Sequence, residues 1–108
     1  MWLNGKPPEK DYYAVIFAST KIENLGQDYY DLDNALMELA QKENGFLGWE
    51  SVRNENQSIF ISYWKTTDDI NRWKINSTHL SAKAQVGKWY KRYLSQICKV
   101  ESSRLFEK

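Results

Sequence analysis

The stretch Ser58-Ile59-Phe60-Ile61-Ser62-Tyr63-Trp64 decides the fold of this chain. Its side chains alternate, so that one face of a strand carries two isoleucines and a tyrosine, and the other carries Phe60 and Trp64 with two serines. Turn-forming residues 54–57 precede it, and residues 49–53 before them predict a second strand. Because the connection is short, the two strands are expected to form an antiparallel hairpin.

A first helix is expected upstream of the hairpin, from about residue 27 to 43. Large apolar side chains recur there at helical spacing: Tyr29, Leu32, Leu36 and Leu39. Aspartates crowd the first turns, where the helix dipole favours anions, and Asn44-Gly45 supplies a left-handed stop. Both ends of this helix are therefore marked in the sequence.

A second helical region is expected downstream of the hairpin. Thr66 and Asp69 have the spacing of a capping box, and Trp73 belongs to the short helix that follows. Residues 76–78 (Asn-Ser-Thr) predict an interruption and a new cap, so that a further helix would cover residues 79 to about 90. Such a break would open space between the helix and the sheet.

Strands are expected at both ends of the domain. Residues 12–19 form a continuous apolar run typical of an interior strand, residues 20–26 a loop, and residues 93–101 an alternating final strand. The element order is that of an α+β ferredoxin-like βαββαβ fold, with a four-stranded antiparallel sheet and both helices on one face.

The expected domain spans residues 12–101, between a flexible N-terminal lead-in (1–11) and a polar C-terminal tail (102–108). The face of the sheet away from the helices is left bare. The rings that alternate on the strands, including Phe60 and Trp64, would make that face large and apolar. A second copy stacked face to face would cover it, which predicts a homodimer.

Composition narrows the range of functions. The chain has 108 residues, enough for one domain, and its net charge of +1 gives no general attraction to nucleic acid or a membrane. The RNA-recognition motif shares the element order, but residues 58–62 lack the glycine and basic residue of its signature. The single cysteine excludes an intrachain disulfide, and no apolar run predicts a signal peptide or a spanning helix, so we expect a cytoplasmic protein.

Several short motifs, in this order, resemble the antibiotic biosynthesis monooxygenase superfamily of dimeric α+β barrels, and best match its small uncharacterised bacterial branch. They are Tyr13-Ala14-Val15-Ile16-Phe17, Gly45-Phe46-Leu47-Gly48-x-Glu50-Ser51-x-Arg53, Ser62-Tyr63-Trp64, Trp73-Lys74, His79-Leu80 and Trp89-Tyr90-x-x-Tyr93. The resemblance implies a homodimer with a pocket in each subunit between sheet and helices. It implies less about the reaction, because members include cofactor-free oxygenases, heme-degrading enzymes and proteins with no known activity.

Two residues are candidates for catalysis. His79 is the only histidine, and its unperturbed pKa near neutrality suits a general base or proton shuttle. Glu50 follows Gly48-Trp49, an apolar setting that could raise its pKa. The alternatives are a helix-start histidine bonded to a neighbour, and a carboxylate that faces solvent or forms an ion pair between subunits.

Four aromatic residues are candidates for binding a flat substrate: Trp64, Trp73, Trp89 and Tyr90. The alternative for each is packing in the core or in a dimer interface. We expect a pocket at the predicted helix break, with Trp64, Trp73 and His79 on or near its wall.

The resulting hypothesis is a cofactor-independent monooxygenase acting on a small aromatic or polyketide-like molecule, and the alternative is a non-catalytic ligand-binding or structural homodimer. Heme degradation would require an Asn on the first strand and a His about ten residues beyond the Trp, but Lys83 stands ten residues after Trp73 and residues 12–19 contain no Asn. No heme or other cofactor is expected, and one Cys with one His makes a metal site improbable.

Overall fold

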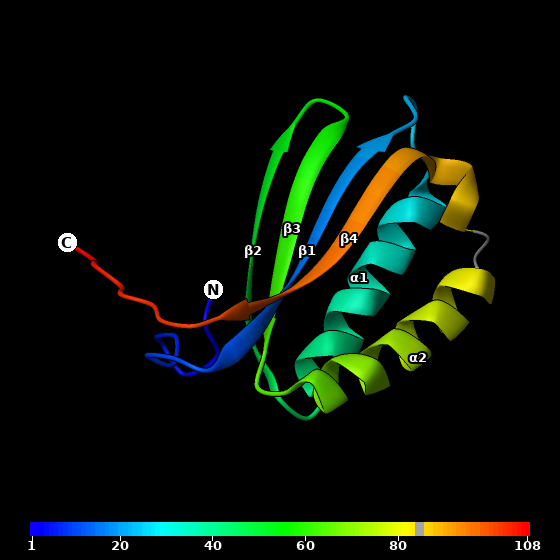
Figure 1. Cartoon of the computed structure of the whole chain (residues 1–108). Coiled ribbons are helices and arrows are strands. Elements are labelled where there is room, and N and C mark those ends of the chain that lie inside the picture. The colour runs from blue at the N-terminus through cyan, green and yellow to red at the C-terminus, as the bar shows by residue number, and fades with distance from the viewer. Residues whose placement is uncertain (84–85) are drawn as a thin grey trace.

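The computed structural model describes the backbone of residues 1–83 and 86–108, and the side chains of residues 1–78 and 87–108. Its elements follow the expected order, with a short 3-10 helix added before the last strand: β1 (Tyr12–Lys21), α1 (Gln27–Lys42), β2 (Phe46–Asn54), β3 (Gln57–Trp64), α2 (Thr67–Lys83), η1 (Val86–Trp89) and β4 (Tyr90–Val100). The four strands form one antiparallel sheet in the order β2-β3-β1-β4, and both helices lie on one of its faces (Figure 1). The predicted ferredoxin-like fold is confirmed.

The register of the sheet shows which side chains face the helices. Phe17 of β1 lies opposite Phe60 of β3, and Tyr13 lies opposite Trp64. Trp64 is fully buried, packs on Phe46 and Trp73, and donates its indole N–H to Ser62 Oγ at 2.9 Å. The series that contains Phe60 and Trp64 therefore points toward the helices.

The prediction that Phe60 and Trp64 would form the bare face of the sheet is wrong. The open face instead carries the other series of β3, with Ile59 and Tyr63, and Val52 of β2 opposite Ile59. The physical reason is packing, because Trp64 is buried beneath the helices against Phe46 and Trp73.

Two apolar clusters hold the helices against the sheet. The first lies at the α1 C-terminus and the α2 N-terminus: Ala40, Phe46, Trp64 and Ile70, with Tyr13, Val15, Trp49 and Trp73 packed against them. The second joins the start of α1 to η1: Tyr29, Leu32 and Trp89, with Ile22, Leu25, Leu36 and Tyr90 packed against them.

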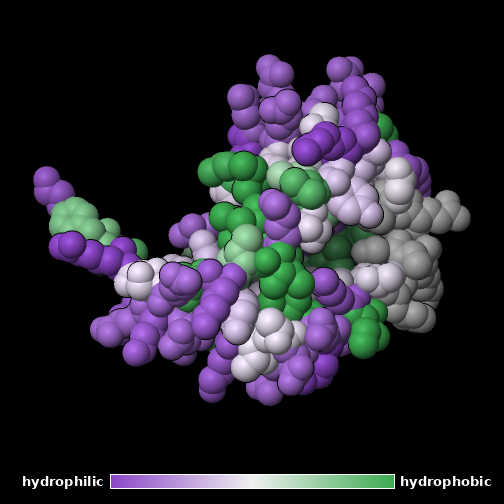
Figure 2. Space-filling model, in the orientation of Figure 1, coloured by the Kyte–Doolittle hydropathy of each residue, from purple (hydrophilic) through white to green (hydrophobic). Residues whose placement is uncertain are grey.

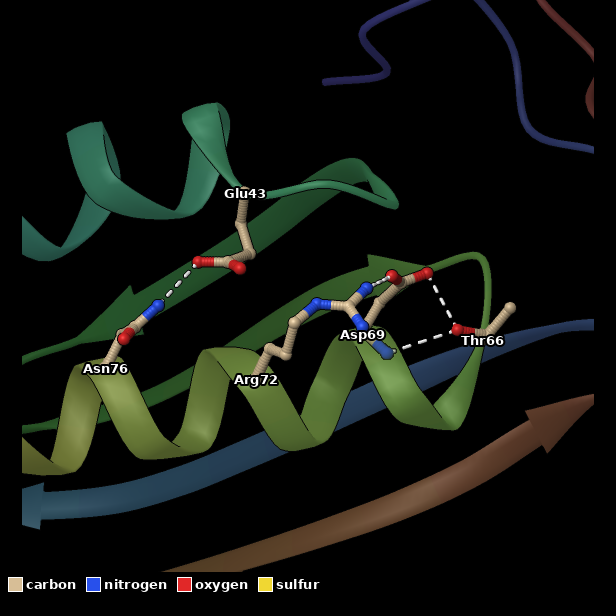
Figure 3. Close-up of polar contacts among 5 residues, drawn as sticks. All are labelled: Glu43, Thr66, Asp69, Arg72 and Asn76. Atoms are coloured by element: carbon tan, nitrogen blue, oxygen red, sulfur yellow. Dashed lines mark hydrogen bonds and ion pairs between the residues drawn. The ribbon is translucent and has the colours of Figure 1, made fainter.

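The start of α2 is fixed by the predicted Thr66–Asp69 pair (Figure 3). Thr66 Oγ1 accepts the Asp69 backbone N–H at 3.1 Å and donates to Asp69 Oδ2 at 2.8 Å, while Arg72 forms an ion pair with the same carboxylate. Gly45, at φ +86°, lies against this carboxylate, and a Cβ there would overlap it. α1 ends before this point, with Glu43 as its extended C-cap, so Gly45 serves the turn into β2 and makes room for the α2 cap.

The predicted interruption at residues 76–78 is wrong, because α2 continues unbroken to Lys83. The polar residues there have partners that are compatible with a helix. The Asn76 side-chain amide donates to Glu43 at the end of α1 at 3.0 Å (Figure 3), and Ser77 Oγ donates to the Lys74 carbonyl one turn back. Residues 86–89 form η1 and Tyr90 begins β4, so the further helix expected to reach Tyr90 is also wrong.

Both termini follow defined courses. The segment expected to be a loose lead-in lies along the edge of β2, where the backbone N–H of Trp49 donates to the Met1 carbonyl. The Trp2 ring stacks on the Tyr63 ring, with centroids 4.3 Å apart. Ser103 is bonded to the Pro8 and Glu9 carbonyls, and the tail then extends away from the body (Figure 1). No described helix has the length and apolarity that crossing a bilayer requires.

Candidate functional site

A row of four rings crosses the helix-facing side of the sheet, one from each strand: Trp49, Phe60, Phe17 and Tyr93. Trp49 stacks on Phe60 with centroids 6.0 Å apart, Phe60 lies opposite Phe17 in register, and Phe17 stacks on Tyr93 at 5.3 Å. All four remain partly exposed in the described structure, and Tyr93 is 60% exposed. We call this set the aromatic row.

The aromatic row borders a cleft between the sheet and the helices. Among the described residues α1 packs against β2 and α2 against β3, and the side chains of β4 are exposed along almost the whole strand. Figure 2 shows a hollowed, hydrophobic area between β4 and the helices.

A buried lysine lies beside one end of the row. Lys21, the last residue of β1, is 4% exposed, and its Nζ donates to Ser58 Oγ at 2.6 Å and to Ser19 Oγ at 3.3 Å. The rings of Tyr29 and Tyr90 lie 5.8 and 5.9 Å from Nζ, within the range of cation–π attraction. We call these five residues the Lys21 cluster.

Two charged side chains influence this cluster. Burial lowers the pKa of Lys21, and the positive charge of Arg53 on β2 lowers it further, while Asp33 on α1 opposes them. Burial likewise raises the pKa of Asp33, against the attraction of Lys21 and Arg53. The cluster and its two charged neighbours carry two cations and one carboxylate, so their net charge is positive when all three are ionised.

The tyrosines of the Lys21 cluster are held neutral. Burial is the main cause that raises the pKa of both Tyr29 and Tyr90. Both phenols are therefore hydroxyl groups at neutral pH, and each can donate as well as accept a hydrogen bond.

The predicted aromatic site residues separate into two groups. Trp64 and Trp73 stack with centroids 5.8 Å apart in the first apolar cluster, where Trp64 is fully buried. Trp89 is buried against Tyr29 in the second cluster, and the next residue, Tyr90, reaches Lys21. The structure brings Tyr90, but neither Trp64 nor Trp73, to the Lys21 cluster.

The structure describes the side chain of only one of the two predicted catalytic residues, Glu50 and His79. Glu50 lies on the open face, opposite Ile61, and accepts a hydrogen bond from Tyr63 at 3.3 Å. Burial and the Glu50 charge raise the pKa of Tyr63 to about 12. Glu50 thus points away from the cleft, and the His79 side chain lies outside the described residues.

Sequence reasoning missed Lys21 because the apolar run ends at Ser19 and residues 20–26 were expected to form a loop. The strand continues for two residues, and a register irregularity with β4 occurs between Thr20 and Lys21. The available signal was alternation, since Lys21 lies an even number of positions after Phe17 and Ser19 and so shares their face of the strand.

In the part of the chain that the structure describes, no group of three or more potential metal ligands occurs.

Comparison with known proteins gives one relative in sequence and several in structure. No protein-family model matches the chain. It is 41% identical over 105 residues to the uncharacterized protein YqjZ of Bacillus subtilis, an alignment that covers 95% of this chain and 91% of YqjZ.

Two solved structures resemble the fold at low sequence identity. SnoaB of Streptomyces nogalater, a cofactor-independent oxygenase, matches with TM-score 0.69 and 10% identity over 86% of this chain and 96% of its own. A Nitrosomonas europaea protein provisionally named an antibiotic biosynthesis monooxygenase matches with TM-score 0.66 and 14% identity over 80% of this chain and 95% of its own.

Proposed function

This chain belongs to the family of Bacillus subtilis YqjZ and has the antibiotic biosynthesis monooxygenase fold, and from that premise we propose that it is a cofactor-independent monooxygenase acting on a small aromatic or polyketide-like molecule. One observation carries the proposal. The cleft between sheet and helices places a row of partly exposed rings directly beside a polar, positively charged cluster. Such a site suits a flat molecule with an ionisable oxygen.

The chemistry requires little from the protein. A substrate methylene flanked by aromatic or carbonyl groups loses a proton, and the resulting carbanion reduces oxygen. One oxygen atom becomes the new carbonyl, the other leaves as water, and the four electrons come from the methylene carbon. The protein has to orient the ring, exclude water and move protons.

Residues of the cleft fit these tasks. Phe17 and Tyr93 would stack on the substrate ring, and the Tyr90 hydroxyl would bond a substrate oxygen. Trp73 and Trp89 would support the helices that close the cleft. His79 of α2 is retained as the candidate base because of its near-neutral unperturbed pKa.

Oxygen consumption tests the proposal. Protein treated with a chelator would be supplied with a panel of enolisable aryl ketones and polycyclic phenols in an oxygen electrode. We expect uptake that is proportional to protein concentration and matched by formation of an oxygenated product. Tight binding of panel members without oxygen uptake would instead favour the non-catalytic ligand-binding dimer.

We further propose that the chain acts as a homodimer closed through the open faces of two sheets. That face exposes Val52, Ile59 and Leu94, and a groove of about 370 Å³ runs over it, with Ala18 and Arg92 among its lining residues. Burying this apolar surface would favour association. The exposed Leu105 and Phe106 of the tail supply further apolar area.

A further inference from the structure

Lys21 is a buried cation that the fold alone does not explain. Burying an ammonium group is costly unless a carboxylate or several hydrogen-bond acceptors surround it. The ion pairs among the described residues join Arg72 to Asp69, Lys88 to Asp28 and Lys99 to Asp11. Lys21 is in none of them, so no described carboxylate oxygen lies within 4.0 Å of its Nζ.

The partners of Lys21 are neutral and do not use all of its donors. Two N–H groups are directed to Ser58 Oγ at 2.6 Å and Ser19 Oγ at 3.3 Å, and these hydroxyls are themselves 3.2 Å apart. An ammonium group has three donors, so one remains for a further acceptor. The rings of Tyr29 and Tyr90 attract the charge but accept no strong hydrogen bond.

The groups that face Lys21 leave the cluster positive. Among the described residues, Arg53 on β2 adds a second cation and Asp33 on α1 contributes a carboxylate. The phenols of Tyr29 on α1 and Tyr90 on β4 are neutral. The hydroxyl groups of Ser19 on β1 and Ser58 on β3 are also uncharged. One bound negative charge would therefore neutralise the site.

We propose that the Lys21 cluster is an oxyanion-binding subsite, in which Lys21 Nζ holds the phenolate or enolate oxygen of an aromatic substrate whose ring stacks on Phe17 and Tyr93. This inference deepens the proposed function and rests on it. Lys21 is then a binding residue that favours the ionised substrate, the form that reacts with oxygen. Burial disfavours the charged form of Lys21 and lowers its pKa, and a bound anion would stabilise that charged form.

The spacing of the two parts fits one small molecule. Phe17, Ser19 and Lys21 follow one another on the same face of β1, so neighbouring side chains are about 7 Å apart. Tyr93 lies opposite Ser19 in register and stacks on Phe17. A fused aromatic ring over Phe17 and Tyr93 can thus reach Lys21 with an oxygen substituent.

Binding of a coloured phenol tests the subsite without requiring turnover. The probe is 4-nitro-1-naphthol, whose ionised form predominates near neutral pH and absorbs at longer wavelength than its neutral form; the uncharged control is its methyl ether. Lys21→Met removes the ammonium, Lys21→Arg preserves the charge, and Lys74→Met removes an exposed lysine of α2 as the matched control.

We expect the wild-type protein to bind the naphtholate in its ionised form. Lys21→Met should weaken that binding by about 10- to 100-fold and should change binding of the ether by less than about 3-fold. Lys21→Arg should restore part of the loss, and Lys74→Met should behave as wild type. Absence of naphtholate binding by the wild type, unchanged binding by Lys21→Met, or equal loss of naphtholate and ether would each overturn the proposal.

The outcome separates the two proposals. Selective binding of the naphtholate together with no oxygen uptake from any substrate would retain the subsite and reject the oxygenase. Oxygen uptake that Lys21→Met leaves unchanged would retain the oxygenase and reject the subsite.

Discussion

Lys21 and Ser58 stand 37 residues apart in the sequence, yet Lys21 Nζ donates to Ser58 Oγ at 2.6 Å across the β1–β3 pairing. The bond ties a buried ammonium to a neutral hydroxyl, and no described carboxylate lies within ion-pair distance of it. Such an arrangement lowers stability relative to an apolar side chain of similar length, and it is commonly retained for binding or catalysis.

Lys21→Met should therefore fold at least as well as the wild type at neutral pH. We expect a free energy of unfolding that is unchanged or higher by up to about 2 kcal/mol, because the variant removes a buried charge and leaves Ser19 and Ser58 bonded to each other. Urea denaturation measures the difference. A loss of more than about 1 kcal/mol would show that the ammonium stabilises the fold.

The same comparison has a predicted pH dependence. The pKa of Lys21 is lowered in the folded state from 10.5, so the folded protein binds its proton less tightly than the unfolded chain. The penalty is complete below the folded pKa and disappears as pH rises through the interval up to 10.5. The stability advantage of Lys21→Met over the wild type should shrink across that interval, and an advantage that grew with pH would contradict the assignment.

Gly45→Ala should destabilise the protein by more than about 2 kcal/mol. Gly45 has φ +86°, and its added Cβ would overlap the Asp69 carboxylate that caps α2. Gly5→Ala is the matched control, because Gly5 has φ +84° but nothing within 4 Å of the added Cβ. Thermal unfolding of both variants separates backbone strain from the clash, and equal losses would mean that the clash contributes nothing.

Alternation in residues 58–64 and marked helix ends were sufficient to predict the element order, because these signals are local. They did not determine which face of β3 the helices cover, since that depends on how helices and sheet share the bulky rings Phe60 and Trp64. They also gave a false helix break at residues 76–78, because the Asn76 partner is Glu43, which lies on another element.

The candidate site was harder to predict for the same reason. Tyr90 could be singled out as an aromatic residue of a motif, but its neighbour Lys21 lies in the segment expected to be a loop. Contacts on both sides extend β1 to Lys21: it pairs with Tyr90 of β4, and its backbone N–H donates to the Asn56 carbonyl. The indole ring of Trp64 could have stacked on a ligand, but the residue is fully buried in the core. The sequence cannot distinguish these two roles, because they differ only in how the ring is packed.

Ile59→Lys should dissociate the homodimer. Ile59 is 43% exposed on the open face beside Val52, and burying an added charge there between two apolar sheet faces would be costly. Ile75→Lys is the control, since Ile75 is 71% exposed on α2 and away from that face. Sedimentation velocity should show a dimer for the wild type and Ile75→Lys, and a monomer for Ile59→Lys. A folded wild-type monomer at micromolar concentration would reject the dimer.

His79→Ala should lower the oxygenase rate by roughly 10²- to 10⁴-fold and leave the dimer intact, as expected for removal of a general base. Glu50→Gln is the comparison, because Glu50 lies on the open face and should affect the rate less. Steady-state rates with a substrate from the oxygen-uptake panel measure both. Full activity of His79→Ala would assign proton transfer to another group.

The most direct test is isotopic labelling of the product under oxygen-18 gas, with chelator-treated protein and no added reductant. The proposed monooxygenase should place one labelled atom in each product molecule, consume one molecule of oxygen per product, and release the second labelled atom as water. Product that takes its oxygen from solvent, or a complete lack of oxygen-dependent product from every compound that binds, would contradict it.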